Sequence, residues 1–247
     1  MSPGEVSAII FFCIFGSAML GMWLRGVLPQ HHLNDETKDL IKLGVGLVGT
    51  MAALLLGLLV ASAKSSYDTR SSELTQMAAD VVLLDRALAH YGPATGPIRG
   101  ILKVGVARMI DQFWSSKEDT RTSQAAGNVV YDKIQELVPT SDGQRALQSQ
   151  AESTLVSFAQ MRLLLFAQSG SAIATPFLVV VVFWLSVLFV SFGLFAPRNG
   201  TAIATLFIAA ISVAGALFLI LELDHPFSGL IQISSAPLRN ALAVLGK

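Results

Sequence analysis

The sequence has few of the residue types that most catalytic and metal-binding sites need. It contains one cysteine, Cys13, and four histidines among 247 residues. A single cysteine cannot form an internal disulfide, and Cys13 lies in an apolar run with no other metal ligand nearby. The sequence also lacks H-E-x-x-H, G-x-S-x-G and Walker motifs. We therefore expect no catalytic residue, no metal site and no cofactor, and we expect that the protein is not an enzyme.

Charged residues are scarce as well. They make up 14% of the chain, and 17 acidic residues balance 17 basic ones. Nucleic-acid binding requires a basic face, which this balance does not suggest, so we expect no nucleic-acid partner. The mean hydropathy of +0.60 is high for a soluble protein and modest for a bundle made only of membrane helices. We expect one part inside a lipid bilayer and another part in water.

Proline is absent between positions 29 and 93, which allows one long helix over 34–91. Asn34 is a suitable N-cap residue for its start. Residues 43–63 form 21 positions without a charge, long enough to cross a hydrocarbon layer of about 30 Å. The apolar residues that follow have the heptad spacing of a helix that packs on another helix, and they are Tyr67, Leu74, Met77, Val81, Leu84 and Leu88.

Three further apolar runs predict membrane helices over 6–24, 171–196 and 201–221. The first run resembles a signal peptide, but Glu5 and no basic residue precede it, so we expect a retained helix. The connection at 197–200 is short enough to require an antiparallel return. The predicted fold is therefore all-α, a polytopic membrane protein with four transmembrane helices.

An extramembrane helical bundle is predicted between the second and third transmembrane helices. Its helices are expected over 97–114 and 124–138, followed by a long one after Thr140 that packs antiparallel on the end of the 34–91 helix. Near the C-terminus, 235–247 has the pattern of a short amphipathic helix. The predicted domains are 1–63 (transmembrane helices 1 and 2), 64–170 (helical bundle), 171–221 (transmembrane helices 3 and 4) and 222–247 (C-terminal tail).

Two patterns imitate binding motifs. Residues 44–49 spell G-x-G-x-x-G, but the dinucleotide motif follows a strand, whereas these glycines lie within a helix. We interpret them as close-packing positions. His31 and His32 lie near the acidic start of the 34–91 helix, where adjacent loop histidines seldom reach one ion, so we interpret this segment as a solvated loop.

The order of these segments resembles the bestrophin-like family of bacterial and plant membrane proteins. Four groups of residues carry the resemblance: Gly49–Gly57 with Ala63, Tyr67 and Arg70; Leu84-Asp85-Arg86 with Tyr91; Arg99, Asp111, Phe113 and Trp114; and Leu223–Gly229. The resemblance implies a distant similarity to bestrophins, which are oligomeric anion channels with the second helix along the pore and cytoplasmic termini. The sequence departs from bestrophins because 43–63 contains no aromatic residue in place of their phenylalanine-rich neck.

The leading hypothesis is a homo-oligomeric ion channel. Thr50, Leu54, Gly57 and Ala61 recur on one helix face and Lys64 follows them, so a ring of subunits would form an apolar constriction that opens onto positive charge. We take these five residues as pore-lining. Lys64 favours anions, whereas Glu222 and Asp224, predicted at the pore mouth, favour cations, and the sequence does not decide between them.

The alternative is a non-conducting scaffold or sensor anchored in the membrane, whose long helix transmits changes in packing. The same heptads suit packing within one subunit, and the oligomeric state would separate the two hypotheses. Four crossings place both termini and 64–170 on one side. Charge counting barely separates the two orientations. We expect an inner or plasma membrane location with that side cytoplasmic.

Overall fold

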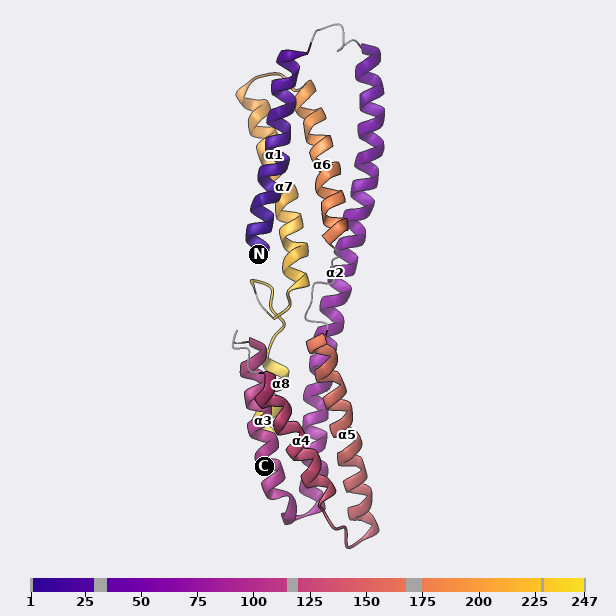
Figure 1. The fold of residues 1–247 in the computed structure, drawn as a ribbon, viewed down its shortest axis with the longest axis vertical. Helices are drawn as coiled ribbons and strands as arrows, with labels where there is room; N and C mark the ends of the chain where they lie inside the picture. Colours follow the sequence, from indigo (N-terminus) through magenta and orange to yellow (C-terminus); the bar gives the residue numbers. More distant parts are fainter. Residues whose placement is uncertain (1, 29–34, 115–119, 168–174, 228, 247) are drawn as a thin grey trace. The chain divides into compact units, whose positions relative to one another are not determined.

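The structure is a computed structural model that describes residues 2–28, 35–114, 120–167, 175–227 and 229–246, and all regular structure in these ranges is helical. Figure 1 shows the order of the elements along the chain. They are α1 (Pro3–Val27), α2 (Asp35–Tyr91), the short 3₁₀ helix η2 (Pro93–Thr95), α3 (Gly96–Trp114), α4 (Thr120–Gln135), α5 (Asp142–Ala167), α6 (Thr175–Phe195), α7 (Gly200–Asp224) and α8 (Ala236–Val244).

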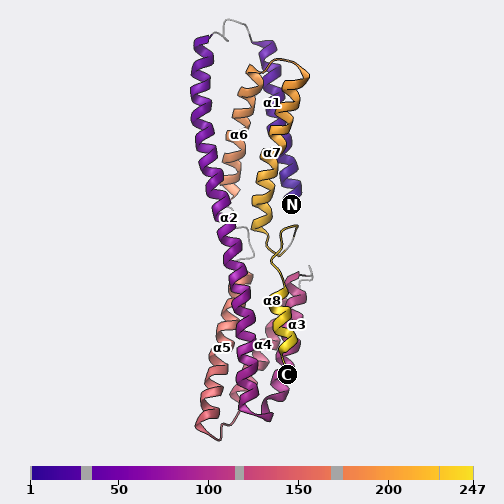
Figure 2. The same cartoon turned by 180° about the vertical axis from the view of Figure 1, so that it is seen from behind.

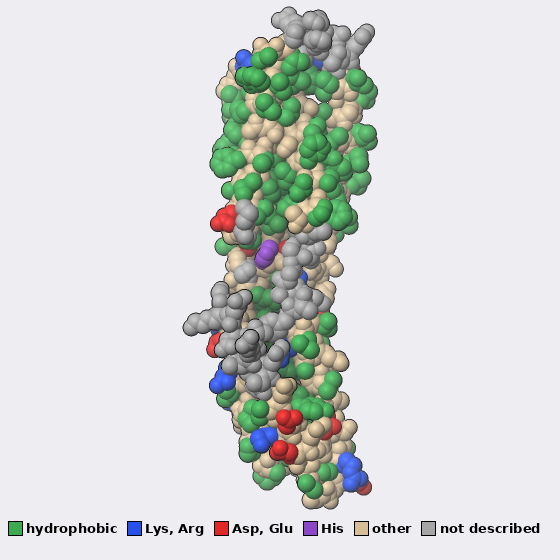
Figure 3. Space-filling model, viewed as in Figure 1, with side chains coloured by type: hydrophobic (Ala, Val, Ile, Leu, Met, Phe, Trp, Pro, Cys, Tyr) green, Lys and Arg blue, Asp and Glu red, His purple; other side chains and the backbone are tan. Residues whose placement is uncertain are grey.

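The chain divides into two compact units, each with its own core. The first unit comprises Met1–Ser66 and Ser171–His225, and the second comprises Tyr67–Gly170 and Pro226–Lys247. In the described residues, α1, α2, α6 and α7 are long and apolar enough to cross a membrane. Hydrophobic side chains gather over these four helices on the face seen in Figure 3, as expected for surfaces that contact lipid.

In the first unit, α1 packs on α6 and α7, and the apolar half of α2 lies beside α6 (Figures 1 and 2). The contact between α1 and α6 is a close one. A Cβ atom added to Gly21 would lie 2.0 Å from the carbonyl oxygen of Val190, and one added to Gly193 would lie 2.0 Å from that of Ala18. Only glycine allows the two backbones to approach so closely.

Two arginines join the ends of α1 and α6 on the same side of the first unit. Arg198, just after α6, donates from Nη2 to the carbonyl oxygen of Met22 at 2.7 Å. Arg25, in the last turn of α1, donates in return to the carbonyl oxygen of Ala196. Each guanidinium therefore satisfies carbonyl groups at the end of the other helix, where the helix dipole favours positive charge.

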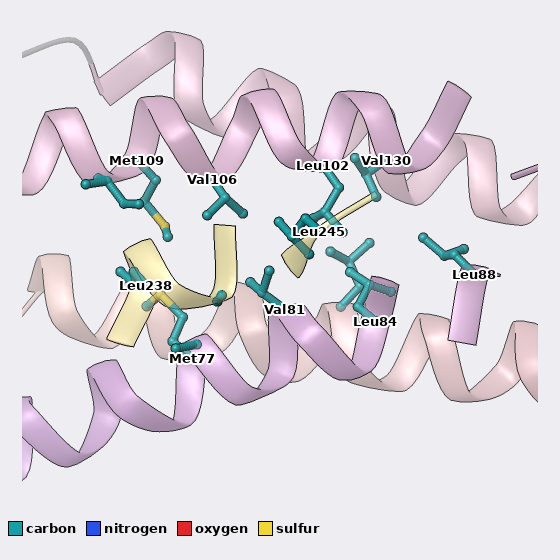
Figure 4. Packing of buried hydrophobic residues seen from close by; sticks show 14 of the residues in the cluster. Met77, Val81, Leu84, Leu88, Leu102, Val106, Met109, Val130, Leu238 and Leu245 are labelled. Carbon is teal, nitrogen blue, oxygen red and sulfur yellow. The ribbon is translucent and has the colours of Figure 1, made fainter. Parts of the chain in front are cut away.

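The second unit contains the end of α2 together with α3, α4, α5 and α8. Figure 4 shows how Met77 and Val81 of α2 face Val106 and Met109 of α3, with Leu238 of α8 beside them. All five side chains are 0 to 2% exposed. The heptad positions predicted for 67–88 thus pack into a core to which α8 also contributes.

A tight turn ends α2. Gly92 has φ 130°, a backbone conformation that favours glycine, and helix η2 follows. The buried hydroxyl of Thr95 donates to the carbonyl oxygens of Leu88 and Gly92, at 2.5 and 2.8 Å. The bond to Leu88 uses a carbonyl group that the end of α2 would otherwise leave without a partner, while Gly92 also accepts the backbone N–H of Thr95.

The predicted helix over 34–91 is observed as α2, a single helix of 57 residues. Other boundaries differ. Helix α1 begins at Pro3 because Ser2 and Glu5 form a capping box, and α7 continues to Asp224. Helix α4 covers Thr120–Gln135 rather than 124–138. Asn34, His31 and His32 lie outside the described residues.

Candidate pore-lining surface

The membrane segment of α2 has one packed face and one open face. Ala52, Leu59 and Ala63 are 2%, 5% and 0% exposed and belong to the core of the first unit. On the opposite face, Leu54 is 71% exposed, and a Cβ atom added to Gly57 would meet no atom within 4 Å. The core of the first unit therefore uses only one side of this helix.

The five residues predicted to line a pore all lie on the open face. Their steps of four, three, four and three residues place them in one row along the helix. All five are exposed. We call this row the α2 stripe, and it consists of Thr50, Leu54, Gly57, Ala61 and Lys64.

The α2 stripe offers little polarity until it reaches Lys64. The hydroxyl of Thr50 donates to the carbonyl oxygen of Gly46 at 2.9 Å, so that its hydrogen is already used within the helix. Leu54, Gly57 and Ala61 add only aliphatic groups. A surface of this kind, repeated around an axis, holds water poorly and forms the type of constriction that closes by dewetting.

The two carboxylates predicted at the pore mouth lie in a different environment. Glu222 and Asp224 belong to the last turn of α7 and are 3% and 1% exposed. Neither is without a partner. Among the three charged candidates, Lys64 is exposed, while the two carboxylates are buried within the chain.

No group of three or more histidine, cysteine, aspartate or glutamate side chains in the described ranges has an arrangement that could hold a metal ion. Cys13 is a free thiol on the exposed side of α1. The described residues therefore offer no metal-ligand cluster beside the α2 stripe.

Two of the residues that carry the family resemblance, Asp85 and Arg99, meet in the second unit. Arg99 of α3 donates to both carboxylate oxygens of Asp85 on α2, from Nε at 2.7 Å and from Nη2 at 2.8 Å. The backbone N–H of Gly246, just after α8, donates to the same carboxylate at 3.2 Å. Lys103 donates to the carbonyl oxygen of Leu245 at 3.0 Å. Together these bonds hold the chain after α8 against α2 and α3.

Opposing effects act on the Asp85 carboxyl group. Burial raises its pKa, while hydrogen bonds from Arg99 and Gly246 and the charges of Arg99 and Lys103 lower it. The net effect is a pKa below the ordinary value of an aspartate. The carboxylate is thus held in its charged form, as expected for a carboxylate in a bidentate pair with arginine.

An aromatic cluster forms at the other end of α3. Phe113 and Trp114 lie 5.1 and 5.7 Å from Phe227, measured between ring centroids. The indole N–H of Trp114 donates to the carbonyl oxygen of Ile233 at 2.9 Å. Three of the residues recognised in the sequence therefore hold the segment before α8 against α3. The roles shown by their contacts are structural.

Sequence reasoning did not find the glycine contact between α1 and α6, the exchange of arginines between their ends, or the attachment of Gly246 to Asp85. Gly21 and Gly193 stand 172 positions apart, and no local spacing marks them as neighbours. Arg25 and Arg198 each lie close to the end of an apolar run, and this position indicates a membrane boundary without indicating a hydrogen-bond partner. These features depend on which helices pack together.

Four apolar helices and a helical second unit define the class: this is a helical integral membrane protein. A model of the bestrophin-like domain matches residues 12–238, and the chain belongs to the bestrophin-like family. Among solved structures, it is similar to a point mutant of a bacterial bestrophin homologue from Klebsiella pneumoniae, with 13% sequence identity and a TM-score of 0.68. That match covers 95% of this chain and 98% of the other, and it shows a common fold. A comparison with curated proteins gives no match.

Proposed function

We propose that the protein is a homo-oligomeric ion channel in which the α2 stripe of every subunit lines a central pore. The observation that carries the proposal is the asymmetry of α2. One face packs in the core of the first unit, and the opposite face presents an exposed row of small and aliphatic residues ending at Lys64. A channel of this family's fold needs such a surface along its axis.

Two features of the α2 stripe support particular properties of the pore. Its aliphatic portion around Leu54 suits an apolar gate that closes by dewetting. Its charged end favours anions, because a ring of Lys64 side chains would attract them as they enter. The burial of Glu222 and Asp224 supports a role in shaping the pore mouth without direct contact with the ion stream.

Single-channel recording of the purified protein in planar bilayers tests this function. We expect Leu54→Ser to raise the open probability, because a hydroxyl at the constriction lowers the cost of wetting it. Leu20→Ser is the matched control, since Leu20 is another exposed leucine in a membrane helix, on α1. Equal effects of both substitutions would contradict a gate at Leu54.

Mass measurement in detergent tests the assembly. A closed ring of at least three subunits agrees with the channel proposal. A monomer or dimer that carries no current would instead support a membrane-anchored scaffold.

We further propose that the protein lies in the inner or plasma membrane, with both termini and residues 64–170 in the cytoplasm. Ser149→Cys in a Cys13→Ser background gives a test, because Ser149 is exposed on α5. We expect a membrane-impermeant maleimide to label this variant only after the cells are permeabilised. Labelling in intact cells would indicate the opposite orientation.

A further inference from the structure

The second unit contains an apolar groove between α3, α4 and α5 that is distinct from the α2 stripe. Its walls include Ile101 and Met109 of α3, and Leu155 and Phe158 of α5. Gly127 of α4 borders both its inner part and its wider outer part. The outer part has a volume of about 130 Å³.

The polar groups that line the outer part are all able to donate hydrogen bonds. They are the guanidinium of Arg162, the side-chain amide of Asn128 and the hydroxyl of Tyr131. No aspartate or glutamate is among the described lining residues. Tyr131 accepts a hydrogen bond from Gln135 at 2.9 Å, which leaves its own hydroxyl hydrogen available for donation.

Arg162 is partly withdrawn from water against this apolar wall. Burial lowers the pKa of its guanidinium below the ordinary value. Arginine nevertheless stays charged in proteins. A positive charge in such surroundings attracts an anion more strongly than it would in open water, because the local dielectric constant is lower.

We propose that this groove binds a small organic anion, namely a carboxylate attached to an apolar group about the size of a benzene ring. The apolar group would lie against Leu155 and Phe158, and the carboxylate would meet Arg162. The volume agrees with this size, since an apolar protein cavity of about 150 Å³ accommodates benzene. The proposal does not depend on ion conduction by the protein.

Fluorine NMR on the full-length protein in phosphatidylcholine nanodiscs tests the proposal, with 4-fluorobenzoate as the probe and 4-fluorobenzyl alcohol as its neutral counterpart. We expect saturable broadening of the benzoate signal that empty nanodiscs do not produce. Broadening equal to that of empty nanodiscs, or tighter binding of the alcohol than of the benzoate, would overturn the proposal.

Groove-filling variants then locate the site. A Cβ atom at Gly127 would meet no atom within 4 Å, so Gly127→Leu adds its side chain to open space in the groove. We expect it to weaken binding of both probes by about tenfold or more. Val156→Trp, at an exposed position on the groove wall, is a second filling variant should the first fail to fold.

Gly100→Leu is the matched control, because Gly100 is an exposed helical glycine on α3 with equally open space around it and lies outside the groove. It should leave the binding of both probes unchanged. Loss of binding in this control, or full binding in both filling variants, would place the probe elsewhere and overturn the proposal.

Arg162→Met separates the charged contact from the apolar one. We expect this substitution to weaken the binding of 4-fluorobenzoate by about tenfold. It should change the affinity for 4-fluorobenzyl alcohol by less than about twofold. An equal loss of affinity for both probes would mean that Arg162 only supports the shape of the groove. Unchanged binding of 4-fluorobenzoate would mean that Arg162 does not bind the carboxylate, which would overturn the proposed anion site.

Discussion

Gly193 of α6 lies directly against Ala18 of α1, so closely that a Cβ atom at position 193 would stand 2.0 Å from the Ala18 carbonyl oxygen. The neighbouring atom belongs to the backbone, and therefore no side-chain rotation relieves the clash. Gly21 meets Val190 in the same way from the opposite helix. The two glycines set the separation between α1 and α6.

We therefore predict that Gly193→Ala lowers the stability of the protein by about 1–3 kcal/mol, the usual cost of overpacking. Gly16→Ala is the control, because a Cβ atom there meets nothing within 4 Å. That change should be neutral or stabilise α1 slightly, since alanine favours helix more than glycine does. Thermal unfolding in detergent, followed by size-exclusion chromatography, measures both. Equal melting temperatures for the two variants would contradict the close contact.

The exchange of arginines between the ends of α1 and α6 gives a second prediction. Arg198→Ala removes the hydrogen bond to Met22 and should cost about 1 kcal/mol, because carbonyl groups at the end of α1 lose a charged partner. Arg145→Ala should cost close to nothing, since Arg145 and its partner Asp142 are both largely exposed. The same thermal assay compares them. A larger effect at Arg145 than at Arg198 would contradict the capping role.

The pairing of Asp85 with Arg99 predicts a dependence of stability on pH. The folded-state pKa of Asp85 is lower than its unfolded value, which is about 3.9. The pairing therefore contributes its full stabilisation above about pH 4, and this contribution is lost as the pH falls through the folded-state pKa. Asp85→Asn should flatten this part of the profile and destabilise the protein at neutral pH. Chemical denaturation from pH 3 to 7 measures the effect.

Asp142→Asn is the control for that profile, because the Asp142 side chain is 98% exposed. It should follow the wild-type curve. The same Asp85→Asn variant should also speed hydrogen exchange at the Gly246 amide, whose bond to the carboxylate is 3.2 Å long. Unchanged exchange at Gly246 would mean that the tail is held by α8 alone.

The proposed selectivity gives a further prediction for Lys64. In the proposed pore, Lys64→Glu would replace a positive ring by a negative one and should lower the ratio of anion to cation permeability by about twofold or more. Reversal potentials under a salt gradient measure that ratio. Lys133→Glu makes the same exchange on α4, where the side chain is 43% exposed, and should leave the ratio unchanged. A pore that does not respond to Lys64→Glu would have its selective ring elsewhere.

Long-range order along one helix was predictable from the sequence, while contacts between helices were not. The absence of proline and the heptad spacing predicted α2 as one helix, because both are local properties of the chain. The row from Thr50 to Lys64 was predictable for the same reason. That this row is exposed became evident only from the packing of Ala52, Leu59 and Ala63 on the other side.

Other features depend on partners that are distant in sequence. Asp85 and Arg99 are 14 residues apart across the turn at Gly92, and Gly246 is 161 residues from Asp85. Residues of three helices line the groove beside Arg162, so the sequence pattern of any one helix does not predict it. The burial of Glu222 and Asp224 was likewise not predictable from the sequence, because their position at the end of an apolar run suggests contact with water.

The glycine contact also bears on how a gate in the first unit would move. Helices α1 and α6 touch through backbone atoms, which have no alternative rotamers, so the two helices should shift only as one rigid piece. The apolar half of α2 packs into the core of the same unit through side chains such as Leu55 and Leu59, and side-chain packing of this kind tolerates small sliding motions. Opening would then be a shear of α2 along a fixed wall, and a cross-link between α1 and α6 should leave the current intact.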